Sequence, residues 1–368
     1  MRVLITLPVK VGFDGMTRQV LSYAKYMDRT NLEIDLLSCR GFDPCMKKIV
    51  AEAGFDNVYR IECRDTNQVK YFVELVRLMK QRKYDVIHAN GQSATLAVEM
   101  FAGLLTGCRL RVAHSHNSMC LHQKAHKMLK PLFKITCNDA IACSKDAGNW
   151  LFGEKKYWIL NNGIDVDAFR FRESLRKEYR KKLGLKEDDI ALGNVAAFEP
   201  KKNQSFLIDM MKVLIQNNPK YILYLWGIDG TSKEVVLKKI KNNGLEKNIK
   251  YMGTTDKINE YINAMDLMLL PSMFEGFPVT VVEWQANGLP CILSDTITPD
   301  CNLDGNVKFL PINNGVECWA EQIESCSFDV KDRASNIHIM MLQKKGFDIK
   351  QNANELKEHY LEKLNKKG

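Results

Sequence analysis

The chain has 368 residues, of which 45% are hydrophobic and 26% are charged, a composition that excludes an intrinsically disordered protein. Its length exceeds what one hydrophobic core comfortably serves, so two domains are expected. The net charge of +9 favours an anionic partner such as a nucleoside diphosphate or a phospholipid surface, whereas nucleic acid is not expected because no nucleic-acid-binding motif accompanies the charge.

The first half of the chain alternates short apolar runs with segments of helical periodicity, a pattern typical of βαβ units in a parallel sheet. Strands are predicted at residues 3–8, 33–38, 57–61, 85–89, 109–114 and 140–143. Helices are predicted between them, with the clearest periodicity at 16–28 and 71–82. This half closes with the turn-rich sequence NNGIDVDAF at 161–169.

A helix rich in lysine and arginine, predicted at 172–183, precedes a second series of the same kind. Its strands are predicted at 190–197, 221–226, 249–252, 267–270 and 291–294, and its helices include 204–216, 233–242 and 278–287. A last helix, 352–366, is charged and amphipathic and falls outside either series. The two halves therefore predict an α/β protein with two parallel sheets.

Cysteine usage and the N-terminal sequence bear on the compartment. The eleven cysteines form no C-x-x-C pair and no zinc-ligand spacing with histidine, which suits free thiols in a reducing environment. The first residues, MRVLITLPVK, are too short for a signal peptide, and no apolar run is long enough to span a bilayer. We therefore expect a cytoplasmic protein.

The most informative stretch, LPSMFEGFPVTVVEWQANGLPCILSD, covers residues 270–295. It begins where a predicted strand ends, and ligands bind at the carboxyl edge of a parallel sheet. Pro278 suits the first turn of the next helix, whose unpaired N–H groups attract a diphosphate. Glu283 lies about 7.5 Å further along that helix, so Glu275 and Glu283 are expected to reach one extended ligand. Their carboxylates would accept hydrogen bonds from the hydroxyls of a sugar nucleotide, although the spacing alone is weak evidence.

This stretch resembles the donor-site signature of family-4 retaining glycosyltransferases, which adopt the GT-B fold of two facing Rossmann-like domains with an interdomain cleft. The sequences NNGIDVDAF and NEYINAMDLMLLPS extend the resemblance, which is densest over residues 156–295. It implies an acceptor-side domain at 1–165 and a donor-binding domain at 166–349. It also implies that the C-terminal helix, 350–368, crosses back onto the first domain.

The resemblance also implies roles for individual residues. Glu275 would hydrogen-bond the transferred sugar near the reacting anomeric carbon, and Glu283 would bind the ribose hydroxyls. The backbone around Gly276 and Phe277 would meet the diphosphate, and Lys202 would neutralise it as it leaves. No metal or other cofactor is expected, because basic groups and helix dipoles stabilise the departing charge.

One departure from the family concerns the phosphate site. Relatives usually place an arginine five residues before the lysine that matches Lys202, where this chain reads NVAAFEPKKN and has Ala197. The change removes a bidentate, charge-assisted contact to phosphate. Lys201 or a residue of the first domain is left as the candidate replacement.

The sequence VKVGFDGMTRQV lies at the first predicted strand-to-helix turn. Gly12 and Gly15 would let the backbone approach a ligand closely, and the segment partly resembles the family's G-G-x-E-R loop near the donor phosphates. Asp14 replaces a glycine of that loop and Thr17 replaces its glutamate. A flexible turn without a ligand role is the alternative.

Histidines follow another predicted strand, in RVAHSHNSM. His116 best matches a family histidine that touches the donor sugar or the acceptor, and it is the second candidate catalytic residue. His114 and Asn117 are candidates on the acceptor side, with a structural role as the alternative. His88 is expected at the end of a strand, in a supporting role at this site. His122 and His126 are four residues apart on one predicted helix, a spacing that can bind a metal. We expect no metal site there, because a third ligand is missing.

A basic amphipathic helix is predicted at 121–133. One face is apolar and a second is rich in lysine, which suits contact with an anionic membrane surface. The alternative is an ordinary surface helix whose apolar stripe packs on the sheet. The apolar positions are Leu121, Ala125, Met128, Leu129, Leu132 and Phe133, and the basic ones are Lys124, Lys127, Lys130 and Lys134.

The predicted reaction is transfer of a hexose or N-acetylhexosamine from a nucleoside diphosphate sugar to a saccharide hydroxyl. Among the relatives uridine is the usual base, and the acceptor is expected to be lipid-linked, in bacterial surface polysaccharide synthesis at the inner face of the membrane. A nucleotide-sugar epimerase of the same architecture is one alternative, against which the segment SMFEGFP argues. A partner subunit without turnover is the other, and Ala197 is the feature that supports it.

Overall fold

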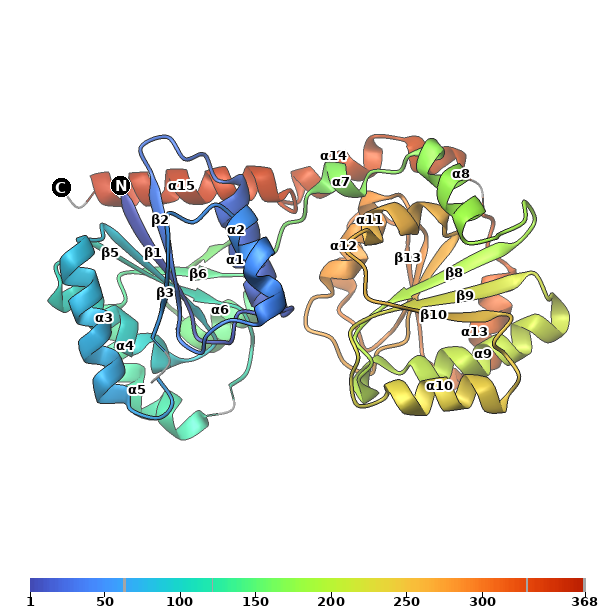
Figure 1. Cartoon of the computed structure of the whole chain (residues 1–368), viewed down its shortest axis with the longest axis horizontal. Helices are drawn as coiled ribbons and strands as arrows, with labels where there is room; N and C mark the ends of the chain where they lie inside the picture. The colour runs from blue at the N-terminus through green and yellow to red at the C-terminus, as the bar shows by residue number, and fades with distance from the viewer. Residues whose placement is uncertain (62–63, 121, 329, 367–368) are drawn as a thin grey trace. The chain divides into compact units, whose positions relative to one another are not determined.

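The computed structural model describes residues 1–61, 64–120, 122–328 and 330–366. Within it the chain divides into two compact units (Figure 1). Unit 1 comprises Met1–Gly163 together with Gly346–Gly368, and unit 2 comprises Ile164–Lys345. The C-terminal segment thus returns to the unit that the chain builds first.

Unit 1 contains a seven-stranded sheet in which every recorded strand pair is parallel, in the order β3-β2-β1-β4-β5-β6-β7. The central strands are buried on both faces, which explains their nearly continuous apolar sequences. The strands are β1 (Arg2–Leu7), β2 (Glu33–Ser38), β3 (Asn57–Arg60), β4 (Val86–Gly91), β5 (Leu110–Ser115), β6 (Asp139–Ala142) and β7 (Trp158–Ile159).

Helices cover both faces of this sheet (Figure 1). One face packs on α1, α2 and α15, and the other on α3 to α6. The long C-terminal helix α15 lies against α1, and Asn352 of α15 donates a hydrogen bond to the carbonyl of Asn161 at 2.9 Å. The helices are α1 (Gly15–Tyr26), α2 (Lys47–Glu52), α3 (Gln68–Arg82), α4 (Ala97–Leu105), α5 (Gln123–Thr136), α6 (Lys145–Phe152) and α15 (Ile349–Asn365).

Unit 2 contains a six-stranded parallel sheet in the order β10-β9-β8-β11-β12-β13. Its strands are β8 (Ile190–Val195), β9 (Tyr221–Trp226), β10 (Ile249–Gly253), β11 (Leu267–Leu270), β12 (Cys291–Ser294) and β13 (Val307–Leu310). Its helices are α7 (Val166–Phe169), α8 (Glu173–Lys182), α9 (Gln204–Asn217), α10 (Lys233–Asn242), α11 (Ile258–Tyr261), α12 (Val279–Ala286), α13 (Gly315–Glu324) and α14 (Ile337–Lys344). The predicted α/β class with two parallel sheets is confirmed.

Several local predictions are corrected. The strand expected at 85–89 runs to Gly91, so His88 lies in the middle of β4 and not at its end. The strand expected at 190–197 ends at Val195. The short strands β7 and β13 were not predicted, because two to four residues show too little alternation to stand out from a loop.

Each sheet has a topological switch point beside its first strand. In unit 1 the chain order reverses between β1 and β4, and in unit 2 between β8 and β11. The loops that leave the carboxyl ends of two such strands diverge to opposite faces, which opens a crevice where ligands of α/β proteins bind. Ligand-binding residues are therefore expected in the loops that follow β1, β4, β8 and β11. No helix in the described part of the chain is long and apolar enough to cross a membrane.

Candidate active site

In unit 2, Lys202 and Glu275 meet at the switch point. Lys202 ends the 3₁₀ turn Pro200–Lys202 after β8, and Glu275 lies in the loop after β11. The two side chains form an ion pair and are 18% and 12% exposed. The Ser272 hydroxyl donates a second hydrogen bond to the same carboxylate oxygen of Glu275, at 2.8 Å. The sequence-predicted sugar-binding carboxylate and phosphate-binding ammonium are thus in direct contact.

A backbone contact ties the same two loops together. The N–H of Met273 donates to the carbonyl of Lys201 at 2.7 Å. The loop after β11 is also fixed to β12, because the Ser294 and Thr296 hydroxyls both donate to the carbonyl of Ser272. The ion pair therefore sits on anchored backbone, which suits a site that must hold its geometry.

Helix α12 begins four residues after Glu275, at Val279. Pro278 is the N-cap residue, with extended backbone (φ −79°, ψ 98°), and no side chain caps the helix. Pro278 thus precedes the helix, which corrects its predicted position in the first turn. The N–H groups of an uncapped first turn attract an anion. A Cβ built on Gly276 would meet nothing within 4 Å, so the fold itself does not require glycine there.

Phe277 and Glu283 flank this helix start. Phe277 is half-buried in the loop, and Glu283 lies four residues into α12 with only 1% of its surface exposed. Glu283 thus belongs to the helix that begins at the predicted diphosphate site, about 6 Å along its axis from Val279. Its predicted contact with a ribose stays a prediction.

The segment around Ala197 is closely bonded to its own chain. The carbonyl of Ala197 accepts hydrogen bonds from the Gln204 side chain at 3.0 Å and from the N–H of Glu199 at 2.8 Å. Lys201, a candidate to replace the family's arginine, forms an exposed ion pair with Glu199 at 3.5 Å. Its ammonium is thus paired with a carboxylate of its own loop.

In unit 1, His116 follows β5 and contacts Asn90 at the end of β4. The Nε2 atom of His116 lies 2.8 Å from Oδ1 of Asn90, and Nδ2 of Asn90 donates to the carbonyl of Thr6 on β1 at 3.2 Å. Asn90 is fully buried, whereas His116 is half-buried. Sequence reasoning missed Asn90; the available signal was a polar residue at the end of the buried run DVIHAN.

His114 lies deeper in the same face of the sheet. Its ring is fully buried, and its predicted place on the acceptor side stays a prediction beside the structural alternative. Nδ1 of His114 lies 3.1 Å from Nε2 of His88, and Nδ1 of His88 is hydrogen-bonded to the hydroxyl of Tyr360 on α15. The His114 ring also packs on that of His116, with 4.1 Å between centroids. Asn117 is exposed.

Burial keeps these histidines neutral. It lowers the pKa of His88 to about 3 and that of His116 to about 3, and it holds the pKa of His114 well below its usual value. The cause is the loss of water around a charged imidazolium, with a smaller contribution at His88 and His114 from neighbouring histidines. A neutral imidazole carries one donor and one acceptor, so each ring has a defined hydrogen-bonding direction.

The loop after β1 contains the two glycines singled out from the sequence. A Cβ on Gly12 would come no closer than 3.6 Å to the Lys10 carbonyl, and one on Gly15 would meet nothing within 4 Å. Asp14 is the N-cap of α1 and accepts hydrogen bonds from the N–H groups of Met16 and Thr17, each at 3.0 Å. The departures from the family loop thus build a side-chain cap, and ligand contact by the glycines stays a prediction.

The basic amphipathic helix is α5. Leu121 lies outside the described residues, and His122 precedes the helix, which corrects its placement inside it. Most of the predicted apolar stripe packs into the core that α3, α4 and α6 share. For this part of the helix, the alternative of a surface helix packed on the sheet holds. Met128 and Ile135 are 74% and 77% exposed on the outer face. The residues of the stripe that contact the core are Leu129, Leu132 and Phe133.

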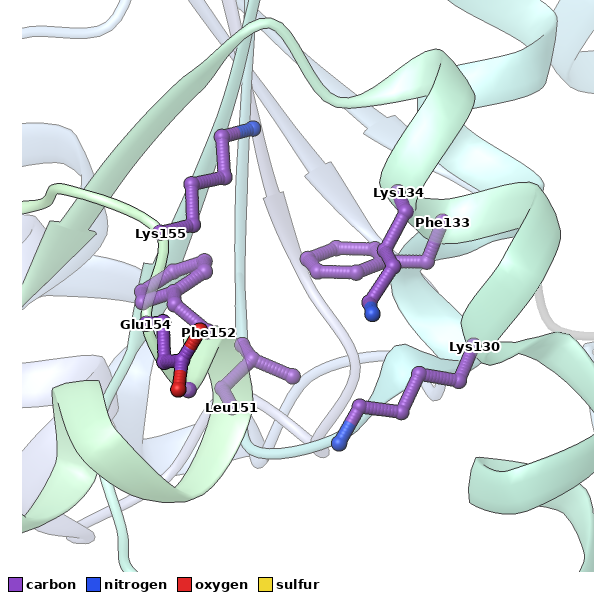
Figure 2. Close-up of a pocket in the computed structure, with 8 residues that line it drawn as sticks. Lys130, Phe133, Lys134, Leu151, Phe152, Glu154 and Lys155 are labelled. Carbon is purple, nitrogen blue, oxygen red and sulfur yellow. The ribbon is translucent and has the colours of Figure 1, made fainter.

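A hollow of about 390 Å³ lies between the C-terminal ends of α5 and α6, with side chains of both segments facing it (Figure 2). These helix ends lead into β6 and β7, so the hollow is at the amino edge of the sheet, opposite the switch point. Lys155 donates to the carbonyl of Cys137 at 2.8 Å, and lysines near helix C-termini stabilise the unpaired carbonyls. We therefore assign the hollow no part in the site.

Comparison with known proteins finds relatives that match most of the chain. Family models described as "Glycosyltransferase Family 4" and "Glycosyl transferases group 1" match residues 13–168 and 176–335. A protein of Bacillus subtilis (strain 168) that carries the name EpsF is 29% identical over 359 residues, covering 93% of this chain and 92% of the relative. The Escherichia coli UDP-Gal:alpha-D-GlcNAc-diphosphoundecaprenol alpha-1,3-galactosyltransferase is 24% identical, with 82% of each chain covered.

Solved structures share the whole fold. HepE of Anabaena in complex with UDP superposes with a TM-score of 0.79 at 21% identity, covering 98% of this chain and 99% of the other. WaaG, a glycosyltransferase involved in lipopolysaccharide biosynthesis, gives a TM-score of 0.71 at 14% identity, covering 95% and 98%. The chain therefore has the GT-B fold of nucleotide-sugar-dependent glycosyltransferases. Within that class it belongs to glycosyltransferase family 4.

Proposed function

We propose that this glycosyltransferase moves a hexose or N-acetylhexosamine from a UDP-sugar to a saccharide hydroxyl, with retention of the anomeric configuration. The observation that carries the proposal is the contact of Lys202 with Glu275 at the β8/β11 switch point, beside the uncapped start of α12. The ammonium and the helix N-terminus match a diphosphate, and the carboxylate matches a sugar hydroxyl. The complex of Anabaena HepE with UDP supports uridine as the base.

The proposed chemistry uses groups of the chain and no metal. The bond between the anomeric carbon and the diphosphate oxygen breaks, and a bond from the acceptor oxygen to that carbon forms on the same face. The acceptor proton passes to the departing diphosphate. Lys202 and the N–H groups at the start of α12 offset the charge that develops on the diphosphate, while Glu275 holds the sugar by a hydroxyl.

We further propose that the acceptor is lipid-linked and that the enzyme works at the inner face of a bacterial membrane in polysaccharide synthesis. The printed name of the Escherichia coli relative specifies an undecaprenol-linked acceptor for that protein. The outer face of α5 presents exposed Met128 and Ile135. Lys124, Lys127 and Lys134 are exposed on the same helix, a combination that favours an anionic interface.

Transfer assays test the proposal. The purified chain is incubated in EDTA with UDP-glucose, UDP-galactose or UDP-N-acetylglucosamine and a bacterial undecaprenyl-diphosphate saccharide. We expect an α-linked product from an α-configured donor, with release of UDP and no need for metal. Interconversion of UDP-sugars without acceptor would instead show an epimerase. Absence of any turnover would favour a partner subunit and contradict the proposal.

A further inference from the structure

The hydrogen bonds of Asn90 fix the orientation of its own side-chain amide. Its nitrogen lies 3.2 Å from the carbonyl oxygen of Thr6, and its oxygen lies 2.8 Å from Nε2 of His116. The reverse orientation would place two acceptor oxygens against each other at Thr6. The fully buried amide therefore presents an acceptor to His116.

An acceptor at this position determines the tautomer of His116. An amide oxygen cannot donate, so Nε2 of His116 must carry the proton. The ring is neutral, because burial lowers the pKa of His116 to about 3. The single proton is thus on Nε2, and Nδ1 carries a lone pair. Among the described residues, none is recorded as a hydrogen-bond partner of Nδ1.

The surroundings of His116 hold this arrangement in place. Its backbone N–H donates to the carbonyl of Gly91 at 2.9 Å, and its ring packs on that of His114. The nearby imidazoles of His114 and His88 are neutral as well, because burial lowers both pKa values. Asn90 bridges β1 and β4 across the switch point, so the tautomer is set at the edge where a substrate binds.

We propose that Asn90 is a positioning residue that holds His116 in the Nε2–H form, so that Nδ1 accepts a hydrogen bond from a sugar hydroxyl during transfer. The inference rests on the proposed function. The hydroxyl belongs either to the acceptor or to the transferred sugar, and both present the same donor to Nδ1.

The tautomer can be read without any substrate. Protein labelled with ¹⁵N in histidine is examined by long-range ¹H–¹⁵N correlation, with the His116 signals assigned by their loss in His116→Gln. We expect a protonated Nε2 and an unprotonated Nδ1 at neutral pH. Asn90→Leu should abolish this preference, while Asn138→Ala, which removes two side-chain hydrogen bonds to the backbone at the amino edge, should retain it. A protonated Nδ1 in the wild type would overturn the inference.

Activity supplies the second readout. Asn90→Leu should lower the transfer rate about ten- to a hundredfold while UDP still binds, because a misdirected group loses its contact in the reacting geometry. Loss of both transfer and acceptor-independent hydrolysis of the UDP-sugar would assign the hydroxyl to the donor sugar. Loss of transfer alone would assign it to the acceptor. An Asn90→Leu enzyme within twofold of wild type would contradict the inference.

Asn90→Asp separates positioning from folding. A carboxyl group at this position still presents an acceptor to Nε2 of His116, and its other oxygen, which faces the Thr6 carbonyl, carries the proton that avoids two opposed acceptors. Asn90→Asp should therefore retain the Nε2–H tautomer of His116 that Asn90→Leu loses, which a purely structural role of Asn90 would not predict. Loss of this tautomer in a folded Asn90→Asp variant would overturn the inference. Failure of the wild type to bind UDP would instead refute the proposed function, and the tautomer measurement would still decide the role of Asn90.

Discussion

The ammonium group of Lys202 and the carboxylate of Glu275 form an ion pair across the carboxyl ends of β8 and β11. Each group compensates the charge of the other, and both are largely buried. A diphosphate would compete for Lys202, and a sugar hydroxyl would compete for Glu275. The pair therefore compensates two largely buried charges, each of which suits an opposite half of the donor.

Removing the charge of Glu275 is expected to affect transfer more than nucleotide binding. Glu275→Gln should lower the transfer rate about 10²- to 10³-fold, the range seen when one aligned polar group is lost from a reacting centre. UDP affinity should stay within severalfold of wild type, because Lys202 is retained. Steady-state kinetics and calorimetry measure the two effects.

Asp209→Asn is the matched control for that change, because it breaks the ion pair that Asp209 forms with Lys239 between α9 and α10. It should leave the transfer rate near that of wild type. Equal losses in Glu275→Gln and Asp209→Asn would mean that Glu275 stabilises the unit and takes no part in the reaction.

Restoring the family's arginine tests the phosphate site. Ala197 is half-buried on the loop after β8, beside the turn that carries Lys202. Ala197→Arg should tighten UDP binding about tenfold or more, because a charge-assisted hydrogen bond contributes about 1.5–3 kcal/mol. Ala197→Met adds bulk without charge and should not tighten it. Unchanged or weaker binding in Ala197→Arg would show that another group already fills this role.

The outer face of α5 is expected to bind anionic membranes. Lys127→Glu together with Lys134→Glu should weaken binding to phosphatidylglycerol vesicles by about fivefold or more per lysine, because a basic residue near such a surface contributes about 1 kcal/mol. High salt should weaken wild-type binding in the same way. The same charge change at Lys212 and Lys241, exposed on unit 2, is the control. Vesicle co-sedimentation that does not distinguish the two pairs would contradict this role for α5.

The buried histidines of unit 1 predict destabilisation by acid. Burial lowers the pKa of His88 to about 3, against about 6.5 in an unfolded chain. Between these values the unfolded state binds a proton that the folded state excludes, so the free energy of unfolding falls as pH falls below about 6.5. The limiting slope is about 1.4 kcal/mol per pH unit for each such histidine. Denaturant titrations from pH 7 to 5 measure the free energy of unfolding at each pH. In His88→Gln its dependence on pH should be less steep than in wild type by up to about 1.4 kcal/mol per pH unit, because one proton fewer is taken up on unfolding.

His338 is the control with the opposite sign. The carboxylate of Asp304 accepts a hydrogen bond from His338 at 2.8 Å and raises its pKa. Its contribution to stability is complete below about 6.5 and is lost as pH rises through the raised pKa. His338→Gln should therefore leave the slope unchanged below about pH 6.5, where both states of His338 are protonated. An acid slope that is equal in wild type and His88→Gln would contradict the burial of a neutral His88.

Sequence patterns predicted the regular part of this fold well. The strands 221–226, 267–270 and 291–294 have the observed bounds, because buried parallel strands flanked by turns are unambiguous apolar runs. The amphipathic stripe of α5 left two interpretations open, since packing on a sheet and binding a membrane demand the same periodicity. Only the three-dimensional packing separates its buried face from its exposed one.

The site was predictable where the chain brings its residues close in one motif, as with Ser272 and Glu275. The contact of Lys202 with Glu275 spans 73 positions, and local spacing does not contain it. Asn90 escaped notice for a related reason. Its partners lie on two other segments of unit 1, so its role depends on strand order, which periodicity does not determine.

Calorimetric titration with UDP and with GDP, in EDTA, tests the donor site most directly. The account predicts micromolar binding of UDP, weaker binding of GDP, and loss of at least tenfold in UDP affinity in both Lys202→Ala and Glu283→Ala. Lys220→Ala, which removes an exposed ion pair with Asp188, should bind UDP as wild type does. Absence of UDP binding by the wild-type chain, or unchanged affinity in Lys202→Ala and Glu283→Ala, would contradict the assignment of this switch point as the donor site.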